Sequence, residues 1–224
     1  MDLNEGLALL LLPPVGWGVA AVWGALWGSF FNVCIYRIPL YESLTSPSSR
    51  CPHCGGAIAW YDNIPIVSWL LLRGRCRKCQ APISPRYILV ELLTTVLTLL
   101  LYHRFVAEGP GPLGADLLRF IVYFYFTGTL VVLSGIDLDH QLLPDSITYP
   151  AIPLFFLLGR LVGDVPWVDA AVGLVAGYLM VRLISDGYYH LTGREGMGYG
   201  DGKLLSMVGA LMGWRALPLT LLVA

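Results

Sequence analysis

The sequence predicts an all-α polytopic membrane protein with about six or more transmembrane helices and a small cytoplasmic module between spans one and two. Two observations support this class: 56% of the 224 residues are apolar and only 13% are charged, and the apolar residues gather in long runs. A soluble domain is about a quarter charged, and a disordered chain has few apolar residues. Both of those classes are therefore excluded, in line with a mean hydropathy of +0.67.

Six apolar runs are candidate spans, because a bilayer requires roughly 20 mostly apolar residues. The first is too long for a cleavable signal peptide, and acidic rather than basic residues precede it. The second and fourth are short, as in tilted or re-entrant helices. The last is still apolar at Ala224, so we expect at least one further span beyond it. The runs are Leu7–Ile35, Ile88–Phe105, Leu117–Ile136, Ile147–Val162, Trp167–Ile184 and Leu204 onward.

The distribution of Lys and Arg predicts the orientation. Loops on one side of the predicted bilayer carry ten of these residues and loops on the other side carry three. Because cytoplasmic loops are enriched in Lys and Arg, we expect the side with ten to be cytoplasmic and the N-terminus to lie outside. Seven of the ten lie between the first two spans: Arg37, Arg50, Arg73, Arg75, Arg77, Lys78 and Arg86.

Four of the five cysteines form two CxxC pairs with residues 55–75 between them. Two such pairs present four thiolates to one tetrahedral Zn²⁺, which is then coordinatively closed and structural rather than catalytic. Two disulfides are the alternative, and the reducing cytoplasm disfavours them. His53 could replace one thiolate, whereas Cys34 is expected to be a small buried residue. The predicted ligands are Cys51, Cys54, Cys76 and Cys79.

Two acidic residues stand at the cytoplasmic ends of apolar runs. Asp137 ends the third run and Asp201 precedes the sixth. Ionisable groups near membrane depth are costly and usually functional, and different helices can bring these two together. Two carboxylates that share a site hold one proton between them. One then acts as a general base toward water and the other as a general acid toward a substrate, which is the chemistry of aspartic peptidases.

Structural roles compete with this interpretation. Asp145 or Ser146 is expected to cap the helix of the fourth run, and Asp201 could equally cap the helix that follows it. Asp139 is two residues from Asp137 and would point to another face of the same helix. His140, in a polar loop, is only a weak candidate for a proton shuttle.

Two other functional classes remain open at this point. Paired carboxylates also serve proton relays in ion-coupled transporters. Transporters tend to place them near the bilayer midplane, between inverted repeats, and the sequence shows no internal repeat. A zinc-stabilised membrane scaffold without chemistry is the other alternative. Incubating the protein with a protein substrate and watching for a loss of mass would distinguish the peptidase, the transporter and the scaffold.

Five segments, which follow one another in the expected order along the sequence, resemble the type IV prepilin peptidases, which are membrane aspartic peptidases. The N-terminal signature, the cysteine module, its surroundings and two acidic motifs all match. The segments are Gly28–Pro39, the paired CxxC residues, Asp62–Pro65 with Ser68-Trp69 and Ile83–Glu91, Ile136–Asp145, and Glu195–Lys203.

The resemblance implies an enzyme of the bacterial inner membrane, in which the Lys and Arg distribution places the N-terminus in the periplasm. It implies removal of the basic leader from prepilin and pseudopilin precursors after a glycine, on the cytoplasmic face, and N-methylation of the new N-terminal Phe by S-adenosylmethionine. The family's catalytic aspartates fall on Asp137 and Asp201. No motif places the methyl-donor site, although the N-terminal signature and the cysteine module are the expected contributors. The expected partners are these precursors and the lipid bilayer, without nucleic acid.

The predicted organisation has three parts. Residues 1–36 form the first span, residues 37–87 form the cytoplasmic four-cysteine zinc module, and residues 88–224 form a multi-spanning aspartic peptidase domain. We expect the C-terminal span or spans of that last domain to lie beyond this sequence.

Overall fold

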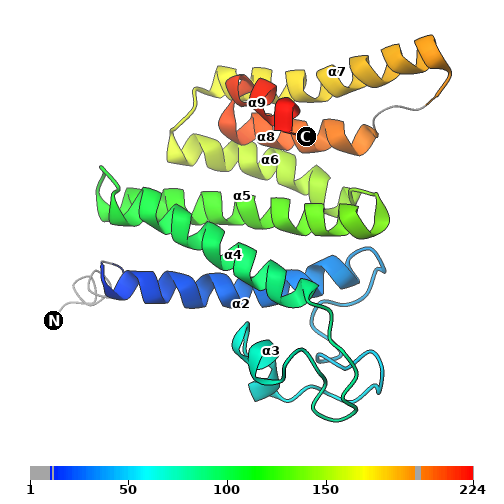
Figure 1. Cartoon of the computed structure of the whole chain (residues 1–224). Coiled ribbons are helices and arrows are strands. Elements are labelled where there is room, and N and C mark those ends of the chain that lie inside the picture. The colour runs from blue at the N-terminus through cyan, green and yellow to red at the C-terminus, as the bar shows by residue number, and fades with distance from the viewer. Residues whose placement is uncertain (1–10, 12, 195–197, 224) are drawn as a thin grey trace. The chain divides into compact units, whose positions relative to one another are not determined.

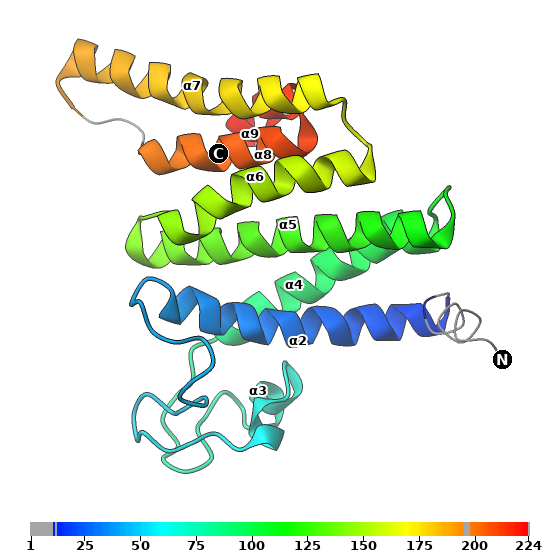
Figure 2. The same cartoon turned by 180° about the vertical axis from the view of Figure 1, so that it is seen from behind.

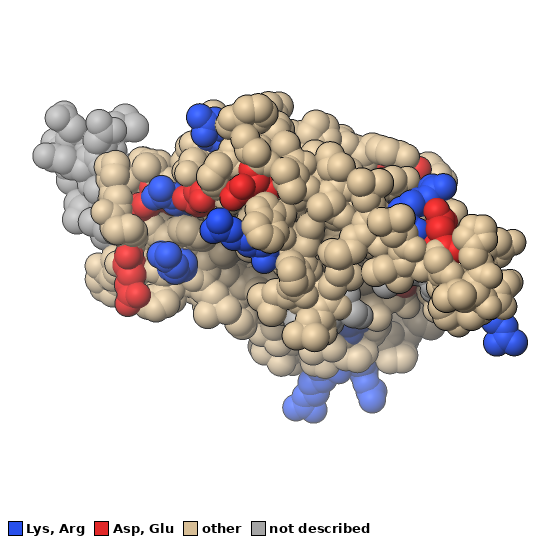
Figure 3. All heavy atoms as spheres, turned by 90° about the horizontal axis from the view of Figure 1, so that it is seen from above, with Lys and Arg blue, Asp and Glu red and all other residues tan. Residues whose placement is uncertain are grey.

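The computed structural model describes residues 11, 13–194 and 198–223. The prediction of an all-α membrane protein is confirmed: the regular elements are helices, accompanied by two isolated β-bridges in the cysteine module (Figures 1 and 2). The chain divides into two compact units, residues 1–136 and residues 137–224. Charged side chains occupy only small parts of the surface seen in Figure 3, as the composition requires.

Four helices in the described part of the chain are long and apolar enough to cross a membrane. They are α2 (Val15–Arg37), α4 with the π-helical turn η2 (Arg86–Ala107), α5 (Leu113–His140) and α7 (Trp167–Thr192). These correspond to the first, second, third and fifth predicted spans. The fourth and sixth predicted runs form α6 (Asp145–Val162) and α8 (Tyr199–Met212), which are not among these four.

The first unit contains α2, α4, most of α5 and the cysteine module with η1 (Trp60–Asn63) and α3 (Val67–Leu71). Helices α2 and α4 touch through small residues. A Cβ atom on Gly28 would lie 2.7 Å from Cα of Glu91, and one on Gly24 would lie 2.7 Å from Oγ1 of Thr98. Asn32 fastens the same pair of helices by donating a hydrogen bond of 3.0 Å to the carbonyl oxygen of Tyr87.

Helix α5 packs on α2 through aromatic and aliphatic side chains. The ring of Phe31 occupies the space over Gly128, and Ile35 does the same over Gly135. The rings of Trp27 and Phe124 stand edge to face with centroids 5.9 Å apart, a favourable geometry for aromatic pairs. The C-terminal end of α2 is therefore held from two sides before the chain enters the cysteine module.

The second unit is built around α8, which is buried along residues 205–211. Helix α7 crosses it at two glycines, because a Cβ on Gly209 would lie 2.3 Å from the carbonyl oxygen of Gly173. Helix α6 covers another face, where Gly159 adjoins Leu211. After α8, the turn η3 (Trp214–Ala216) leads into α9 (Leu217–Val223). Burial of α8 on several faces fixes the start of the helix, where Asp201 lies.

Candidate active site and metal centre

Asp201 lies in the first turn of α8, before the apolar part of the helix begins at Leu204. Its Oδ2 accepts a hydrogen bond of 3.1 Å from the backbone N–H of Gly198, the N-cap residue. The carboxylate thus closes the open end of its own helix, as an acidic residue at this position commonly does. The prediction that Asp201 acts in helix capping is therefore correct in part: it caps from the third helical position rather than from the N-cap itself.

Asp137 belongs to the same compact unit and lies near the C-terminal end of α5, exposed to solvent. Burial of the Asp201 carboxyl raises its pKa, the Gly198 hydrogen bond opposes this, and the negative charge of Asp137 raises the pKa further. The two carboxylates are therefore close enough for the charge of one to act on the other. Two carboxylates that share a site can hold one proton between them, and for Asp137 and Asp201 this stays a prediction.

Asp145 does not cap α6, contrary to the sequence-based expectation. The N-cap of this helix is Pro144, no side chain makes a cap hydrogen bond, and Asp145 is the first helical residue. Its Oδ1 instead pairs with the ammonium of Lys203 in α8. The Lys203 Nζ also lies 4.5 Å from the ring centre of Tyr149, so this cation ties the start of α6 to the start of α8.

Sequence reasoning missed this pair because its members are 58 positions apart. Hydrogen bonding to Asp145 raises the pKa of Lys203, so the ammonium of Lys203 keeps its proton at neutral pH. Asp139 and His140 are exposed at the end of α5. The first part of the second acidic motif, residues 195–197, lies outside the described residues.

The four predicted ligand cysteines lie together, and each thiol sulfur is within 4.8 Å of the others. Sγ of Cys51 and Sγ of Cys79 are 3.8 Å apart, which is about the sulfur separation on a tetrahedral Zn²⁺ with bonds near 2.3 Å. All five cysteines are free thiols. Cys34 is buried in α2, as expected, and His53 is not part of the described four-sulfur group.

The two CxxC pairs form equivalent knuckles. In the first, Gly55 N–H donates to the carbonyl oxygen of Cys51 over 2.9 Å, and in the second Gln80 N–H donates to that of Cys76 over 3.0 Å. Both turns need a positive φ, +66° at Gly55 and +59° at Gln80. Hydrogen bonds from the backbone N–H groups of Cys54 and His53 lower the pKa of the Cys51 thiol to about 6. A hydrogen bond from the backbone of Ala81 lowers the pKa of Cys79, but burial and the neighbouring thiols outweigh it and raise this pKa to about 11. A bound cation would favour the thiolate form of all four cysteines. The residues present therefore fit a thiolate-bound metal ion.

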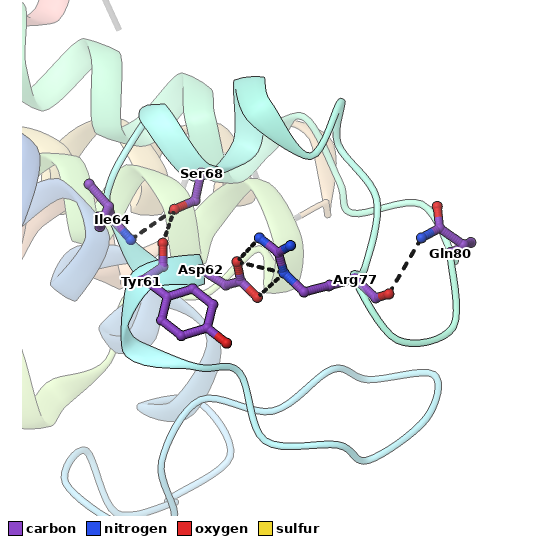
Figure 4. Close-up of polar contacts among 6 residues, drawn as sticks. All are labelled: Tyr61, Asp62, Ile64, Ser68, Arg77 and Gln80. Atoms are coloured by element: carbon purple, nitrogen blue, oxygen red, sulfur yellow. Dashed lines mark hydrogen bonds and ion pairs between the residues drawn. The ribbon is translucent and has the colours of Figure 1, made fainter.

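A polar network supports the second knuckle (Figure 4). The guanidinium of Arg77 binds the carboxylate of Asp62 through its Nε and Nη2 atoms, at distances from 2.6 to 3.0 Å. The hydroxyl of Ser68 donates to the carbonyl oxygen of Tyr61 over 2.9 Å and accepts from the N–H of Ile64 over 3.1 Å. The turn η1 and helix α3 are thereby joined to each other and, through Arg77, to the metal-binding knuckle.

Comparisons with known proteins identify the family to which the chain is similar. Residues 22–105 match the model of the bacterial peptidase A24 N-terminal domain, and residues 124–224 match that of the type IV leader peptidase family. A prepilin leader peptidase/N-methyltransferase of Aeromonas hydrophila is 42% identical over 97% of this chain and 82% of its own length. One of Klebsiella pneumoniae is 41% identical over 96% of both chains.

No solved structure matches the chain. The two family models cover residues 22–105 and 124–224, both acidic motifs lie within the second model, and the similarity to the relatives extends over most of their length. The chain therefore belongs to the type IV leader peptidase family.

Proposed function

We propose that this chain is a prepilin leader peptidase and N-methyltransferase of the bacterial inner membrane. It removes the basic leader from type IV prepilins and pseudopilins after a glycine, at the cytoplasmic face. It then methylates the new N-terminal Phe with S-adenosylmethionine. The names and close similarity of the relatives support the activity, and the electrostatic proximity of Asp137 and Asp201 is the structural observation on which the proposal rests.

The proposed peptidase mechanism uses one proton held between the two carboxylates. The ionised member takes a proton from water, whose oxygen attacks the scissile carbonyl carbon. The protonated member donates a hydrogen bond to the carbonyl oxygen, and later gives its proton to the nitrogen as the C–N bond breaks. The raised pKa of Asp201 favours this residue as the protonated member, because a general acid must keep its proton at the working pH.

The proposed orientation follows from the excess of Lys and Arg between α2 and α4. It places the N-terminus in the periplasm, and the cysteine module and both aspartates on the cytoplasmic side. We retain three functional parts: residues 1–36, residues 37–87 and residues 88–224. In this arrangement the apolar helix of the precursor stays in the bilayer while its leader lies at the cytoplasmic surface.

The four-cysteine group is proposed to hold one structural Zn²⁺. Cys51, Cys54, Cys76 and Cys79 would be its ligands, and no coordination position would be left for a substrate. The ion would supply folding energy to the module. Metal analysis of the purified protein should give about one zinc per chain, and this zinc should be lost in the double variant Cys51→Ser, Cys54→Ser. A zinc-free wild-type protein or a mapped disulfide would contradict the proposal.

The decisive test is cleavage of a purified prepilin in detergent. Asp137→Asn and Asp201→Asn should each abolish leader removal, measured as the mass lost from the precursor. Each variant keeps only one of the two carboxyl groups, which cannot act as the base and the acid at the same time. Asp139→Asn, an exposed neighbour on the same helix, should keep most of the rate. All three variants must still insert into membranes. Cleavage by either Asp137→Asn or Asp201→Asn would refute the assignment, and failure of the wild type would favour a transporter or a scaffold.

A further inference from the structure

The first unit contains a cavity of about 640 Å³ beside the cysteine module. The end of α2, the module and the start of α4 line it, and neither Asp137 nor Asp201 contributes. Cavities that bind small molecules measure about 300–1,000 Å³. This one is therefore large enough for a ligand of the size of a nucleoside derivative.

A buried carboxylate lies at the cavity wall. Glu91 of α4 is only 8% exposed, and its Oε2 accepts a hydrogen bond of 2.7 Å from the backbone N–H of Ile66. The hydroxyl of Ser29 also bonds this carboxyl group. Both donors are uncharged, so neither neutralises a negative charge on Glu91. A cationic ligand in the cavity would do so, and buried charges are normally paired.

The residue that binds Glu91 has a strained backbone. Ile66 lines the cavity with a φ of +63°, which is a genuine outlier for a β-branched residue. Such conformations persist only where the surroundings impose them, and they cluster at ligand-binding and active sites. The hydrogen bond to Glu91 is one of the constraints that hold Ile66 in this conformation.

A second wall residue has an unsatisfied polar atom. Trp69 lines the cavity, and its indole Nε1–H is buried without a hydrogen-bond partner in the described structure. Its ring packs over Gly74, where a Cβ would lie 2.8 Å from Cζ2 of the ring. Buried donors normally have an acceptor. An acceptor atom of a bound ligand would satisfy this one.

We propose that this cavity binds S-adenosylmethionine, with Glu91 balancing the positive charge of the ligand and Trp69 donating a hydrogen bond to it. The inference rests on the methyltransferase function proposed above. Tyr36, Tyr61 and Tyr87 also line the cavity. Aromatic faces of this kind stack on a nucleobase and attract an onium cation. The ligand carries both of these groups, together with acceptor atoms on its adenine and its carboxylate.

The reaction at this site transfers a methyl group from the sulfonium sulfur of S-adenosylmethionine to an amine nitrogen. The lone pair of the new N-terminal amine forms an N–C bond to the methyl carbon, and the S–C bond breaks with its electron pair left on sulfur. The nitrogen then releases one proton to solvent. The products are a methylated amine and a neutral thioether, so the cationic charge that Glu91 balances disappears from sulfur during the reaction.

Direct binding tests the proposal in the full-length, zinc-loaded protein in detergent. Equilibrium dialysis with radiolabelled S-adenosylmethionine should show at least tenfold weaker binding by Glu91→Gln and weaker binding by Trp69→Phe. The matched controls are Glu108→Gln, a carboxylate outside the cavity, and Trp60→Phe, an exposed indole of the same module. Both controls should bind as the wild type does. Photocrosslinking of the ligand to the wild type should label peptides that line the cavity.

Zinc content and leader removal monitor the integrity of each variant. Retention of both by Glu91→Gln, with binding lost, supports the cavity. The proposed binding cavity is refuted if Glu91→Gln and Trp69→Phe both bind the methyl donor as the wild type does. It is also refuted if the crosslinks are confined to peptides outside the cavity, even when the wild type cleaves and methylates. A wild-type protein that cleaves prepilin without binding S-adenosylmethionine also overturns it and leaves the peptidase proposal standing. A wild type that binds the methyl donor but does not cleave refutes the peptidase proposal alone.

Discussion

Asp201 combines a structural contact with a proposed chemical role. The bond from Gly198 N–H to Oδ2 fixes the orientation of the carboxylate, while Oδ1 takes no part in that bond. Helix α8 beneath it is buried, so the carboxylate is held by a rigid element rather than by a mobile loop. Preorganisation of this kind avoids reorganisation of the site during the reaction.

The raised pKa of Asp201 predicts the alkaline limb of the pH–rate profile. The carboxyl group keeps its proton to a higher pH than an ordinary aspartic acid does, because it is partly buried and faces the charge of Asp137. Leader removal should fall as the pH rises through this pKa and the general acid is lost. It should also fall in acid, when both carboxyl groups are protonated. Single-turnover cleavage rates across pH would measure both limbs, and a rate independent of pH would contradict the shared-proton mechanism.

The ion pair between Asp145 and Lys203 should add to the free energy of unfolding only when both residues are present. We expect a coupling free energy of about 0.5–1 kcal/mol between Asp145→Asn and Lys203→Met, because the carboxylate is largely exposed and exposed ion pairs are weak. A double-mutant cycle on unfolding in detergent would measure it. The pair Arg182–Asp186, within α7, provides a comparison for a local ion pair. Strictly additive effects would show that Lys203 and Asp145 do not interact.

At the scale of elements, residue size rather than polarity selects the contact faces of the helices. Helix α2 is apolar all round, yet its buried positions include Gly16, Ala20, Gly24 and Gly28, spaced by four. In a membrane, lipid and neighbouring helices are equally apolar, so close backbone approach at small residues supplies the packing. This spacing was readable in the sequence and would have identified the face that meets α4.

The α7–α8 crossing should not tolerate a methyl group. Gly173→Ala places a Cβ 2.5 Å from the carbonyl oxygen of Gly209, so we expect destabilisation by about 2 kcal/mol, within the usual range for overpacking. Gly187→Ala in the same helix meets nothing within 4 Å and should be neutral or stabilising, because Ala favours helix over Gly. Thermal unfolding in detergent would compare the two variants. Equal stabilities would mean that the helices can separate at no cost.

Substitutions at equivalent positions of the two metal-binding knuckles should change the zinc affinity in opposite directions. Gly55→Ala puts a side chain at φ +66° and should weaken zinc binding, whereas Gln80→Gly relieves the residue at φ +59° and should strengthen it. Each change should amount to about 1 kcal/mol, the cost of the left-handed conformation for a residue with a Cβ. Competition with a chromogenic chelator would measure both affinities. A stronger site in Gly55→Ala would contradict the argument.

At the scale of the whole molecule, metal removal should affect the cysteine module far more than the second unit. The module has few hydrogen-bonded elements apart from its short helices η1 and α3 and depends on the four sulfurs, whereas α6, α7 and α8 pack directly on one another. Chelation should therefore abolish amide protection around residues 49–84 and leave α8 protected. Hydrogen exchange with mass spectrometry would show this, and a uniform loss of protection would contradict it.

Much of the architecture follows from the sequence because a bilayer imposes length and apolarity directly. The runs that became α2, α4, α5 and α7 were recognisable on those grounds. The paired CxxC spacing likewise predicted four sulfurs at one point. The start of α6 was predicted incorrectly in its detail, since local propensity favours Asp145 as a cap whereas an ion pair with the distant Lys203 determines its actual contact.

The candidate sites were only partly predictable. Asp137 and Asp201 were identified because acidic residues beside apolar runs are unusual, and their assignment as catalytic residues stays a prediction. The cavity was not predictable, because it depends on Ile66, Trp69 and Glu91 coming together in three dimensions. The positive φ of Ile66 in particular has no local sequence signal, since a β-branched residue is among the least suited to it.

The crossing at Gly173 and Gly209 also restricts how this chain can change over generations. The space that a side chain on either residue would need is filled by the main chain of the other. A later exchange at the opposite position cannot make room, since no amino acid is smaller than glycine. Descendants that keep this crossing must therefore inherit both residues together, and a lineage that loses one has to reroute the two helices.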